Sequence, residues 1–493
     1  MAMANVNIST KTKEFIEETV PLFINGEFVK SESGKTFESI NPANGDTLAL
    51  VYEAGKEDID KAVKAARSAF ENPDWSDLTT LERGNLMYKL SQLIEENKQI
   101  IAELDSLDNG KPINELLEND IPNAIGQFQY FSGWTTKNTG QTIPVSSDSF
   151  NYTKHEPIGV VGQIIPWNFP FMMAAWKLAP ALATGCTTIL KPAEQTPLSA
   201  IYLAKLIKEA GFPDGVVNIV PGFGQEAGNA LVEHEDVDKI AFTGSTAVGR
   251  SIMKKAADSM KRITLELGGK SPNIILQDAD LDKAIPGAFA AIMANQGEVC
   301  SAGSRLYVHE DIYDEVLTKL TEYAKNVTQG HGLEKGTQMG PLVSKKQQDR
   351  VKDYIQQGIN DGATLLTGGS HSDKGYFVEP TIFTDVTDDM SIVKEEIFGP
   401  VLVAQSFKDL DEAIEKANNS PYGLGAGVWT ESNKNAHYMA DRIKSGSVWI
   451  NCYNLTNPAI PFGGYKQSGF GREMGSYALE NYTEVKSVWM DLI

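Results

Sequence analysis

From residue 158 onward, short β-rich runs alternate with helical stretches, and this alternation constrains the fold more than any other feature of the chain. The runs VVGQII, TTIL, GVVNIV, KIAF and RITLEL are separated by stretches containing MMAAWKLAPALA, SAIYLAKLIKEA, EAGNALVEH and GRSIMKKAADSM. Strands that alternate with helices are typical of a parallel sheet covered by helices on both faces. The sequence therefore predicts a doubly wound α/β lobe of five strands joined by four helices.

A second α/β series begins after Gly269 and includes PNIIL, AIPGAFAAIMANQ, RLYVH, IYDEVLTKLTEYAK, PVLVAQSF, LDEAIEKANN and GSVWINCY. Two α/β lobes in one chain of 493 residues predict two or three domains with a ligand cleft between the lobes. Before the first lobe, Asn25-Gly26 stands between apolar residues and predicts a hairpin turn.

Two strand-like pieces fit neither lobe, SFNYTKHEP and the C-terminal YTEVKSVWM. As isolated strands they would leave unpaired edges, so we expect them to pair across a subunit boundary. A surface hairpin within one chain is the alternative.

Composition excludes several classes of function. The formal charge of −21 argues against nucleic-acid or anionic-membrane surfaces. The longest apolar stretch, residues 169–185, contains Lys177 and Pro180, which favours a buried helix over a membrane span. Three widely separated cysteines form neither a disulfide framework nor a zinc cluster, so no metal is expected. The start MAMANVNISTKTKEF lacks an apolar signal-peptide core, which indicates a cytoplasmic setting.

Polar or glycine-rich turns follow several strands of the first lobe, at the edge where doubly wound sheets bind ligands. KPAEQTP supplies Lys191 and Glu194, where an acid can hold a ribose, and PGFGQEAG supplies Gly222 and Gly224. TGSTAVG, residues 243–249, offers Gly244, Ser245 and a helix start to a pyrophosphate. The turn PWNFPF has no glycine, however, so a dinucleotide site and ordinary strand-to-helix turns both remain open.

Cys300 lies among small and polar residues in NQGEVCSAGSR, whereas Cys186 and Cys452 lie in strand-like runs. An exposed nucleophile and an inert packed thiol are both compatible with this setting. Glu266, between two leucines, is either a general base whose pKa burial would raise or a paired structural charge. The Asn168 side chain is either a donor in a site or part of a turn between prolines.

The motifs IPWNFP, ILKPAEQTP, FTGSTAVG, LELGGKSPN, QGEVCSAGSR, EEIFGP and PFGGYKQSG, in this order, extend over nearly the whole chain. Together they resemble the NAD(P)-dependent aldehyde dehydrogenases, specifically the broad-specificity, non-acylating branch. The resemblance implies a variant Rossmann NAD-binding domain, residues 8–137 and 157–266, and an α/β catalytic domain, residues 267–466. It also implies a small β oligomerisation domain from residues 138–156 and 480–493, in a homotetramer or homodimer.

The resemblance assigns the catalytic roles residue by residue. Cys300 matches the nucleophile that forms a thiohemiacetal with the aldehyde and, after hydride loss to the nicotinamide, a thioester. The Asn168 amide and the Cys300 backbone N–H match the donors to the developing oxyanion. Glu266 matches the general base that activates water for thioester hydrolysis.

The resemblance also assigns the cofactor contacts. Lys191 and Glu194 match the adenosine ribose site, Ser245 and its turn the pyrophosphate site, and Glu396 the nicotinamide ribose site, with Phe398 beside the nicotinamide. The complete set of matched cofactor residues is Ile164, Ile165, Trp167, Lys191, Glu194, Gly224, Phe242, Gly244, Ser245, Val248, Glu396 and Phe398. Because the Glu194 carboxylate would face a 2′-phosphate, NAD is expected rather than NADP.

The matched substrate tunnel is mainly apolar and consists of Phe169, Met173, Trp176, Glu298, Val299, Leu455 and Phe462. Family members often have Gln at the position of Glu298 and an aromatic residue at that of Thr456, so a more acidic, less aromatic mouth is expected here. No arginine at the matched positions would hold a carboxylate or phosphate. The implied reaction is NAD-dependent oxidation of an apolar aldehyde to its acid.

Three other functions compete with this one. The first is oxidation of a cationic aldehyde such as betaine aldehyde, which Glu298 would attract. The second is a CoA-acylating reaction, which is disfavoured because that branch generally lacks the base at Glu266. The third is a catalytically silent structural protein of the same fold, as in lens crystallins derived from this family.

Overall fold

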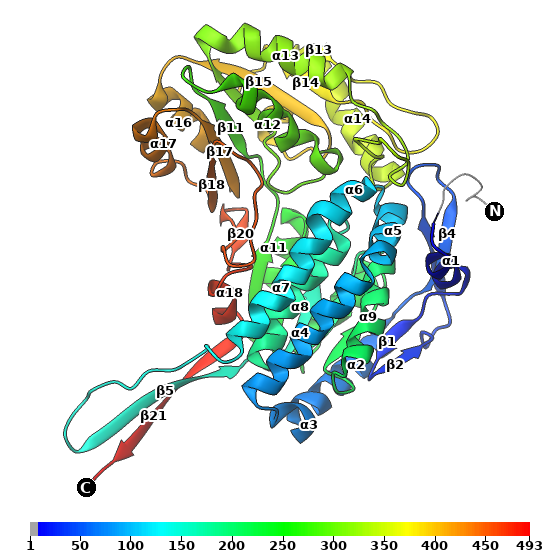
Figure 1. Ribbon diagram of the computed structural model, residues 1–493, viewed down its shortest axis with the longest axis vertical. Coiled ribbons are helices and arrows are strands. Elements are labelled where there is room, and N and C mark those ends of the chain that lie inside the picture. The colour runs from blue at the N-terminus through cyan, green and yellow to red at the C-terminus, as the bar shows by residue number, and fades with distance from the viewer. Residues whose placement is uncertain (1–7) are drawn as a thin grey trace.

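A computed structural model describes residues 8–493 and shows two α/β lobes with a two-stranded arm that projects from the first lobe (Figure 1). Residues 1–7 of the start MAMANVNISTKTKEF, on which the expected lack of a signal peptide partly rests, lie outside the described part. The α/β architecture predicted from the alternation of strands and helices is confirmed.

The first lobe contains an eight-stranded sheet in the order β2-β1-β8-β7-β6-β9-β10-β20. Its five central strands are the predicted ones and run parallel: β8 (Val217–Ile219), β7 (Thr187–Lys191), β6 (Val160–Ile164), β9 (Lys239–Thr243) and β10 (Arg262–Glu266). Antiparallel strands extend both edges, β1 (Leu22–Ile24) and β2 (Glu27–Val29) at one end and β20 (Gly469–Phe470) at the other.

The predicted hairpin turn joins β1 and β2. Asn25 and Gly26 both have positive φ, 52° and 77°, as a two-residue hairpin with the favoured twist requires.

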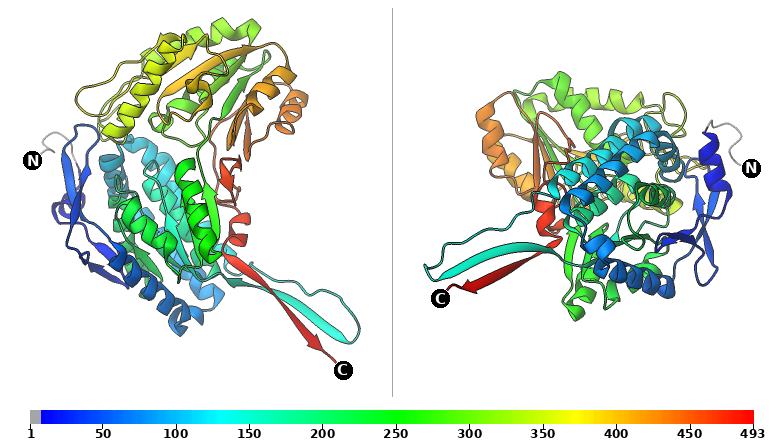
Figure 2. Two further views of the ribbon diagram at one scale, coloured as in Figure 1. Left: turned by 180° about the vertical axis from the view of Figure 1, so that it is seen from behind. Right: turned by 60° about the horizontal axis from the view of Figure 1, so that its bottom comes forward.

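Helices cover both faces of this sheet (Figures 1 and 2). On one face lie α8 (Pro170–Thr184) and α9 (Leu198–Ala210), over which α4 (Thr80–Glu96), α5 (Lys98–Asn109) and α7 (Ile121–Trp134) form a further layer. On the other face lie α2 (Lys56–Glu71), α10 (Asn229–Glu233) and α11 (Thr246–Ala256). Because α8 is enclosed between the sheet and the outer helices, all of its residues are buried, as expected for the long apolar stretch.

The second lobe contains a seven-stranded sheet in the order β13-β14-β15-β12-β11-β17-β18. Its strands are β11 (Pro272–Ile275), β12 (Arg305–His309), β13 (Thr364–Thr367), β14 (Thr381–Thr384), β15 (Val401–Phe407), β17 (Gly425–Trp429) and β18 (Ser447–Ile450), and all but β13 are parallel. Its helices are α12 (Leu281–Met293), α13 (Tyr313–Lys325), α14 (Lys345–Asn360), α16 (Leu410–Asn418) and α17 (Asn433–Ala440).

The two stray strand segments pair with each other. β5 (Ser149–Pro157) and β21 (Thr483–Asp491) form an antiparallel ribbon whose register runs from Thr483 opposite Pro157 to Asp491 opposite Ser149. Figure 2 shows this ribbon extending away from the body. The expectation that β5 and β21 would find their strand partners across a subunit boundary is therefore wrong, because each is the other's partner within the chain.

Within residues 8–493, no helix is both long and apolar enough to cross a bilayer, and no cluster of side chains suitable for a metal ion is present. The three cysteines are free thiols, and only Cys186 is fully buried.

Gly287 on α12 leads to a prediction about stability. A Cβ there would overlap the indole of Trp429, which is buried and held by a 2.8 Å hydrogen bond from Nε1 to Asn273 Oδ1. We expect Gly287→Ala to lower the free energy of unfolding by about 1–3 kcal/mol, because the added methyl group overpacks this part of the core. A gain in helix propensity of up to about 1 kcal/mol offsets part of this loss.

Urea denaturation measures this change. Gly224→Ala is the matched control, because no atom lies within 4 Å of its added Cβ. Equal stabilities for the two variants would contradict the prediction.

Candidate active site

A cavity of about 1010 Å³ lies between the two lobes. Its walls come from the turn after β6, the turn after β9, the end of β10, the segment 294–301 and the loop 453–462, with α7 and its preceding turn on one side. The cavity brings together Cys300, Glu266 and Asn168, which are far apart in the sequence. The sequence predicted these three residues as one site.

Cys300 lies on a tightly wound segment that follows α12. Asn295, Gln296 and Gly297 have positive φ values of 46°, 56° and 76°, an uncommon run that costs backbone strain in the non-glycine residues. On the other side, a Cβ at Gly269 would overlap the Cys300 carbonyl oxygen. The glycine after β10 therefore lets the cysteine segment approach the first lobe closely.

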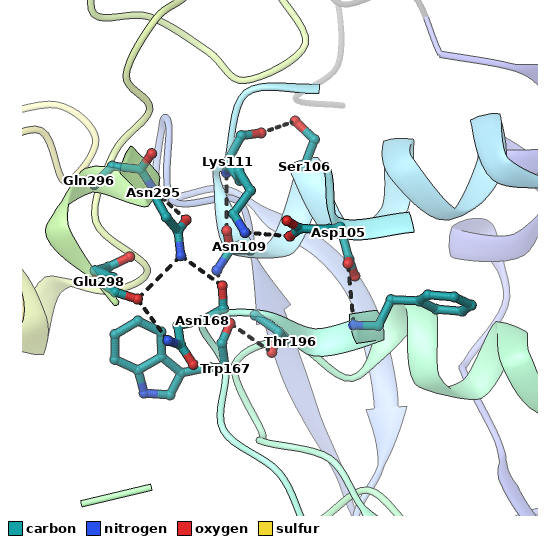
Figure 3. A network of polar contacts seen from close by, with 12 residues as sticks. Asp105, Ser106, Asn109, Lys111, Trp167, Asn168, Thr196, Asn295, Gln296 and Glu298 are labelled. Atoms are coloured by element: carbon teal, nitrogen blue, oxygen red, sulfur yellow. Dashed lines mark hydrogen bonds and ion pairs between the residues drawn. The ribbon is translucent and has the colours of Figure 1, made fainter. Parts of the chain in front are cut away.

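Asn168 is fixed by a network of amides shown in Figure 3. Its Nδ2 donates to the Glu298 carbonyl at 2.7 Å, and the Asn295 Nδ2 donates to the Asn168 carbonyl at 2.8 Å. At the preceding residue, the Trp167 carbonyl accepts a hydrogen bond from the Asn109 Nδ2 at 2.9 Å. Because an amide nitrogen carries two hydrogens, Asn168 retains a second N–H for a ligand in the cavity.

Glu266, at the end of β10, is a buried carboxylate, and in the described part of the chain neither of its oxygens has a hydrogen-bond partner. Burial, and then the charge of Glu473, raise its pKa well above the usual range, while Lys177 and Arg472 act in the opposite direction. This is the environment of a group able to exchange protons near neutrality.

Lys177 and Glu473 form a buried ion pair beside this carboxylate, and Glu473 also lines the cavity. Sequence reasoning missed this pair. In the sequence, Lys177 only interrupts an apolar stretch. The two partners are separated by 296 positions, so no local pattern predicts their pairing.

The Cys300 thiol is protonated in this environment. Burial raises its pKa to about 12, and the carboxylates of Glu396 and Glu266 add to the shift. Since a thiolate is the attacking form, the site needs a nearby base or an added positive charge to activate the sulfur.

The edge of the first sheet offers features that suit a dinucleotide. Ser245 caps the eleven-residue helix α11, and within residues 8–493 the buried Thr243 hydroxyl has no hydrogen-bond partner. A helix N-terminus with a free hydroxyl donor suits a pyrophosphate. On the opposite wall, Glu396 accepts a hydrogen bond from the Gly269 N–H at 2.9 Å, and burial raises its pKa to about 7.

The predicted cofactor residues divide into two groups. Trp167, Gly244, Ser245, Glu396 and Phe398 line the cavity, and the Phe398 ring meets that of Trp167 edge-on at 5.2 Å. The others lie outside its lining, at or near the carboxyl ends of the strands or on the turns that follow: Ile164, Ile165, Lys191, Glu194, Gly224, Phe242 and Val248.

Lys191 and Glu194 lie together at the end of β7. The Lys191 Nζ is buried, donates to the carbonyls of Pro192 and Gly222, and lies 3.9 Å from the half-buried Glu194 carboxylate. The acid is therefore held beside the turn that contains Gly224.

Six of the seven predicted tunnel residues line the cavity: Phe169, Met173, Trp176, Val299, Leu455 and Phe462. The seventh, Glu298, does not line the cavity, so its prediction as a tunnel residue is wrong. Its side chain is fully buried and turned away from the cavity, where Oε1 accepts a hydrogen bond from the Val343 N–H at 3.1 Å. Burial raises the pKa of this carboxyl well above its usual range, so it adds no acidity to the substrate mouth.

The polar outer wall of the cavity was also missed. It includes Glu115, Glu118, Asn119 and Asn123 from the turn before α7 and the start of that helix. In the sequence, these residues have the composition of an ordinary solvated helix face.

The chain is similar to known proteins over almost its full length. The model of the "Aldehyde dehydrogenase family" matches residues 28–488. The Bacillus subtilis protein DhaS is 61% identical over 493 residues, covering 100% of both chains. The structure of the NAD+ complex of an aldehyde dehydrogenase from Bacillus cereus is 61% identical, with a TM-score of 0.99 over 99% of this chain and 100% of that one.

A more distant structure is that of a betaine aldehyde dehydrogenase from Staphylococcus aureus in complex with NAD+. It is 40% identical, with a TM-score of 0.94 over 96% of this chain and 98% of that one.

The raised thiol pKa predicts the reactivity of Cys300 without ligands. Because its pKa is about 12, alkylation by iodoacetamide should be slow at pH 7 and rise about tenfold per pH unit up to pH 10. Glu396→Gln removes a charge that raises this pKa, so it should speed alkylation at any fixed pH. Peptide mapping by mass spectrometry gives the rate at Cys300 itself.

Glu310→Gln, at an exposed position of the second lobe, is the charge-matched control and should leave the rate unchanged. Fast alkylation that does not vary between pH 6 and pH 8 would show that the thiolate already exists, contrary to the prediction.

Proposed function

Since the chain belongs to the aldehyde dehydrogenase family, we propose that it oxidises an apolar aldehyde to the carboxylic acid with NAD, through a covalent intermediate on Cys300. The observation that carries this proposal is the meeting of Cys300, Glu266 and Asn168 on one cavity with the N-terminus of α11. The same observation argues against a silent structural protein, which needs none of these groups.

The Cys300 thiol first gives up its proton to a base such as water. The thiolate then attacks the aldehyde carbon, and the carbonyl oxygen becomes an oxyanion. The spare N–H of Asn168 and the Cys300 backbone N–H are the donors proposed for that oxygen. Because the other Asn168 N–H is bonded to the Glu298 carbonyl, the amide is held in place before the charge develops. Such preorganisation removes the cost of turning a donor toward the oxyanion during the reaction.

Bound NAD supplies the acceptor for the hydride that leaves the thiohemiacetal carbon. This chain would hold the adenosine ribose with Glu194, the pyrophosphate with Ser245 and the turn before α11, and the nicotinamide ribose with Glu396. The proposed preference for NAD over NADP rests on the Glu194 carboxylate, which would repel a 2′-phosphate. The complex of the Bacillus cereus enzyme with NAD+ supports this cofactor.

Glu266 completes the cycle by taking a proton from water, which attacks the thioester and releases the acid and the thiol. A carboxylate with an ordinary pKa is a weak base, and the raised pKa of Glu266 makes it stronger. Since Glu266 acts only when deprotonated, turnover should rise with pH through that raised pKa.

A cationic substrate such as betaine aldehyde is the second candidate, and the similarity to the Staphylococcus aureus enzyme favours it. The argument from Glu298 no longer supports it, because that carboxylate faces away from the cavity. An apolar aldehyde fits better, since Phe169, Trp176 and Phe462 line the inner cavity. The base at Glu266 continues to disfavour the CoA-acylating reaction.

The proposal extends to assembly and setting. We propose a division into an NAD-binding domain, a catalytic domain and an oligomerisation arm, in which the β5–β21 ribbon joins subunits of a homodimer or homotetramer. Trp489, 65% exposed, and Val485, 63% exposed, give this ribbon an apolar surface suited to such contacts. We also propose a cytoplasmic setting, which the three free cysteines support.

Cys300→Ala should abolish NADH formation while NAD binding and folding persist, because hydride leaves only after the sulfur has attacked. NADH absorbance at 340 nm measures the reaction. Cys186→Ala and Cys452→Ala are the matched controls and should retain activity. Comparable losses at all three positions would refute the assignment of Cys300.

Glu266→Gln should separate the two half-reactions. If the carboxylate mainly activates water, hydride transfer occurs once per site before the thioester stalls, so stopped-flow traces should show a burst of NADH followed by slow turnover. Loss of the burst with normal NAD binding would mean that Glu266 is needed earlier, to deprotonate the thiol.

Chain length should control affinity for simple aldehydes. Each methylene buried in an apolar tunnel contributes about 0.8 kcal/mol, so kcat/KM should rise up to about fourfold per carbon from acetaldehyde to propanal and hexanal. Betaine aldehyde, measured at low and high salt, is the comparison. A salt-sensitive advantage of more than tenfold for betaine aldehyde would replace the apolar substrate with a cationic one.

A further inference from the structure

The cavity changes character between its inner and outer ends. Near Cys300 the walls carry the buried side chains of Met173, Trp176 and Phe462. At the outer end the lining includes the exposed polar side chains of Glu118, Asn119 and Thr456, beside the exposed Leu455. A substrate that fills the whole cavity must therefore pass from an apolar into a polar environment.

Asn123, at the start of α7, joins the two ends. Its Oδ1 accepts a 2.8 Å hydrogen bond from the Trp176 Nε1, and its Nδ2 donates at 3.0 Å to the Thr456 Oγ1. Trp176 in turn packs edge-on against Phe462, with ring centroids 5.5 Å apart. Asn123 thus connects α7, α8 and the loop 453–462 around the cavity.

Asn123 and Thr456 retain hydrogen-bonding capacity after these contacts. The Thr456 hydroxyl accepts from Asn123, but within residues 8–493 its own hydrogen is donated to no other group, and the second Nδ2 hydrogen of Asn123 is also free. An alkyl chain that covers these groups removes them from water and returns no hydrogen bond, which is unfavourable. A hydroxyl group can both donate and accept there.

We propose that Asn123 and Thr456 form a specificity collar that favours aldehydes with a neutral hydroxyl at the far end of an apolar chain. This inference rests on the proposed function and names its substrate class. A positive tail is less well served by the two glutamates of the outer wall. Glu118 is exposed, and an ion pair in water contributes little, while burial raises the pKa of Glu115 to about 7 and so reduces its negative charge near neutral pH. An anionic tail would meet Glu118 as a like charge.

The test compares matched aldehydes of six, eight and ten carbons, each with and without a terminal hydroxyl, by their kcat/KM in NADH formation. In the wild-type enzyme, at the length that reaches the collar, the hydroxylated member should be preferred by about threefold to tenfold, the value of one ordinary hydrogen bond. Propanal, which is too short to span the cavity, serves as the reference for chemistry.

Thr456→Val removes the hydroxyl at nearly constant volume and should bring the preference close to one, mainly by lowering kcat/KM for the hydroxylated member of each pair. Thr456→Ser, the matched control, keeps the hydroxyl and should keep the preference. Asn123→Asp keeps the acceptor for Trp176 but loses the amide hydrogens, so the preference should fall while shorter alkyl aldehydes are still oxidised.

The outcomes distinguish the collar from the reaction itself. If the wild-type enzyme forms no NADH from propanal, the proposed function itself is wrong. Activity with propanal but no preference at any length, or a preference that survives Thr456→Val, overturns the collar alone. A larger advantage for a trimethylammonium aldehyde of equal length, abolished by Glu118→Gln, also overturns it and assigns the mouth to a cation.

Discussion

The site depends on the close approach of the two lobes at Gly268 and Gly269, directly after β10. A Cβ at Gly268 would overlap the Glu396 carboxylate, and one at Gly269 would overlap the Cys300 carbonyl oxygen. Glu266 precedes Gly268 by two residues and Gly269 by three, so a single turn sets the positions of Cys300, Glu266 and Glu396. A side chain at Gly269 would have to displace the Cys300 backbone, whereas one at Gly268 would have to displace the Glu396 carboxylate.

The sequence predicted the fold well where local signals are strong. Alternating strands and helices specified the central sheet of the first lobe, and Asn25-Gly26 specified its hairpin. The short antiparallel β20 was not foreseen, because two residues carry no periodicity. The partner of β5 was also wrong, since strand propensity marks an edge but does not say which strand will cover it.

The sequence predicted only those site residues that lie within recognisable motifs. Cys300, Glu266 and Asn168 lie in recognisable sequence and share one cavity. Glu298 shows the limit, because a strand or loop pattern does not tell which way a side chain turns, and this one faces Val343. Asn123 lay outside every motif, and its importance became visible only through its contacts with Trp176 and Thr456.

The strand β20 has a consequence for how ligands reach the cavity. It pairs with β10 through Leu265 and Glu266, and the Leu267 N–H and Gly268 carbonyl are both bonded to Ser468, at 2.9 and 2.8 Å. The chain thus returns from the second lobe and pairs with the first lobe beside Glu266. A hinge motion that parted the lobes would have to break these hydrogen bonds, so a ligand must enter the cavity without a large separation of the two lobes.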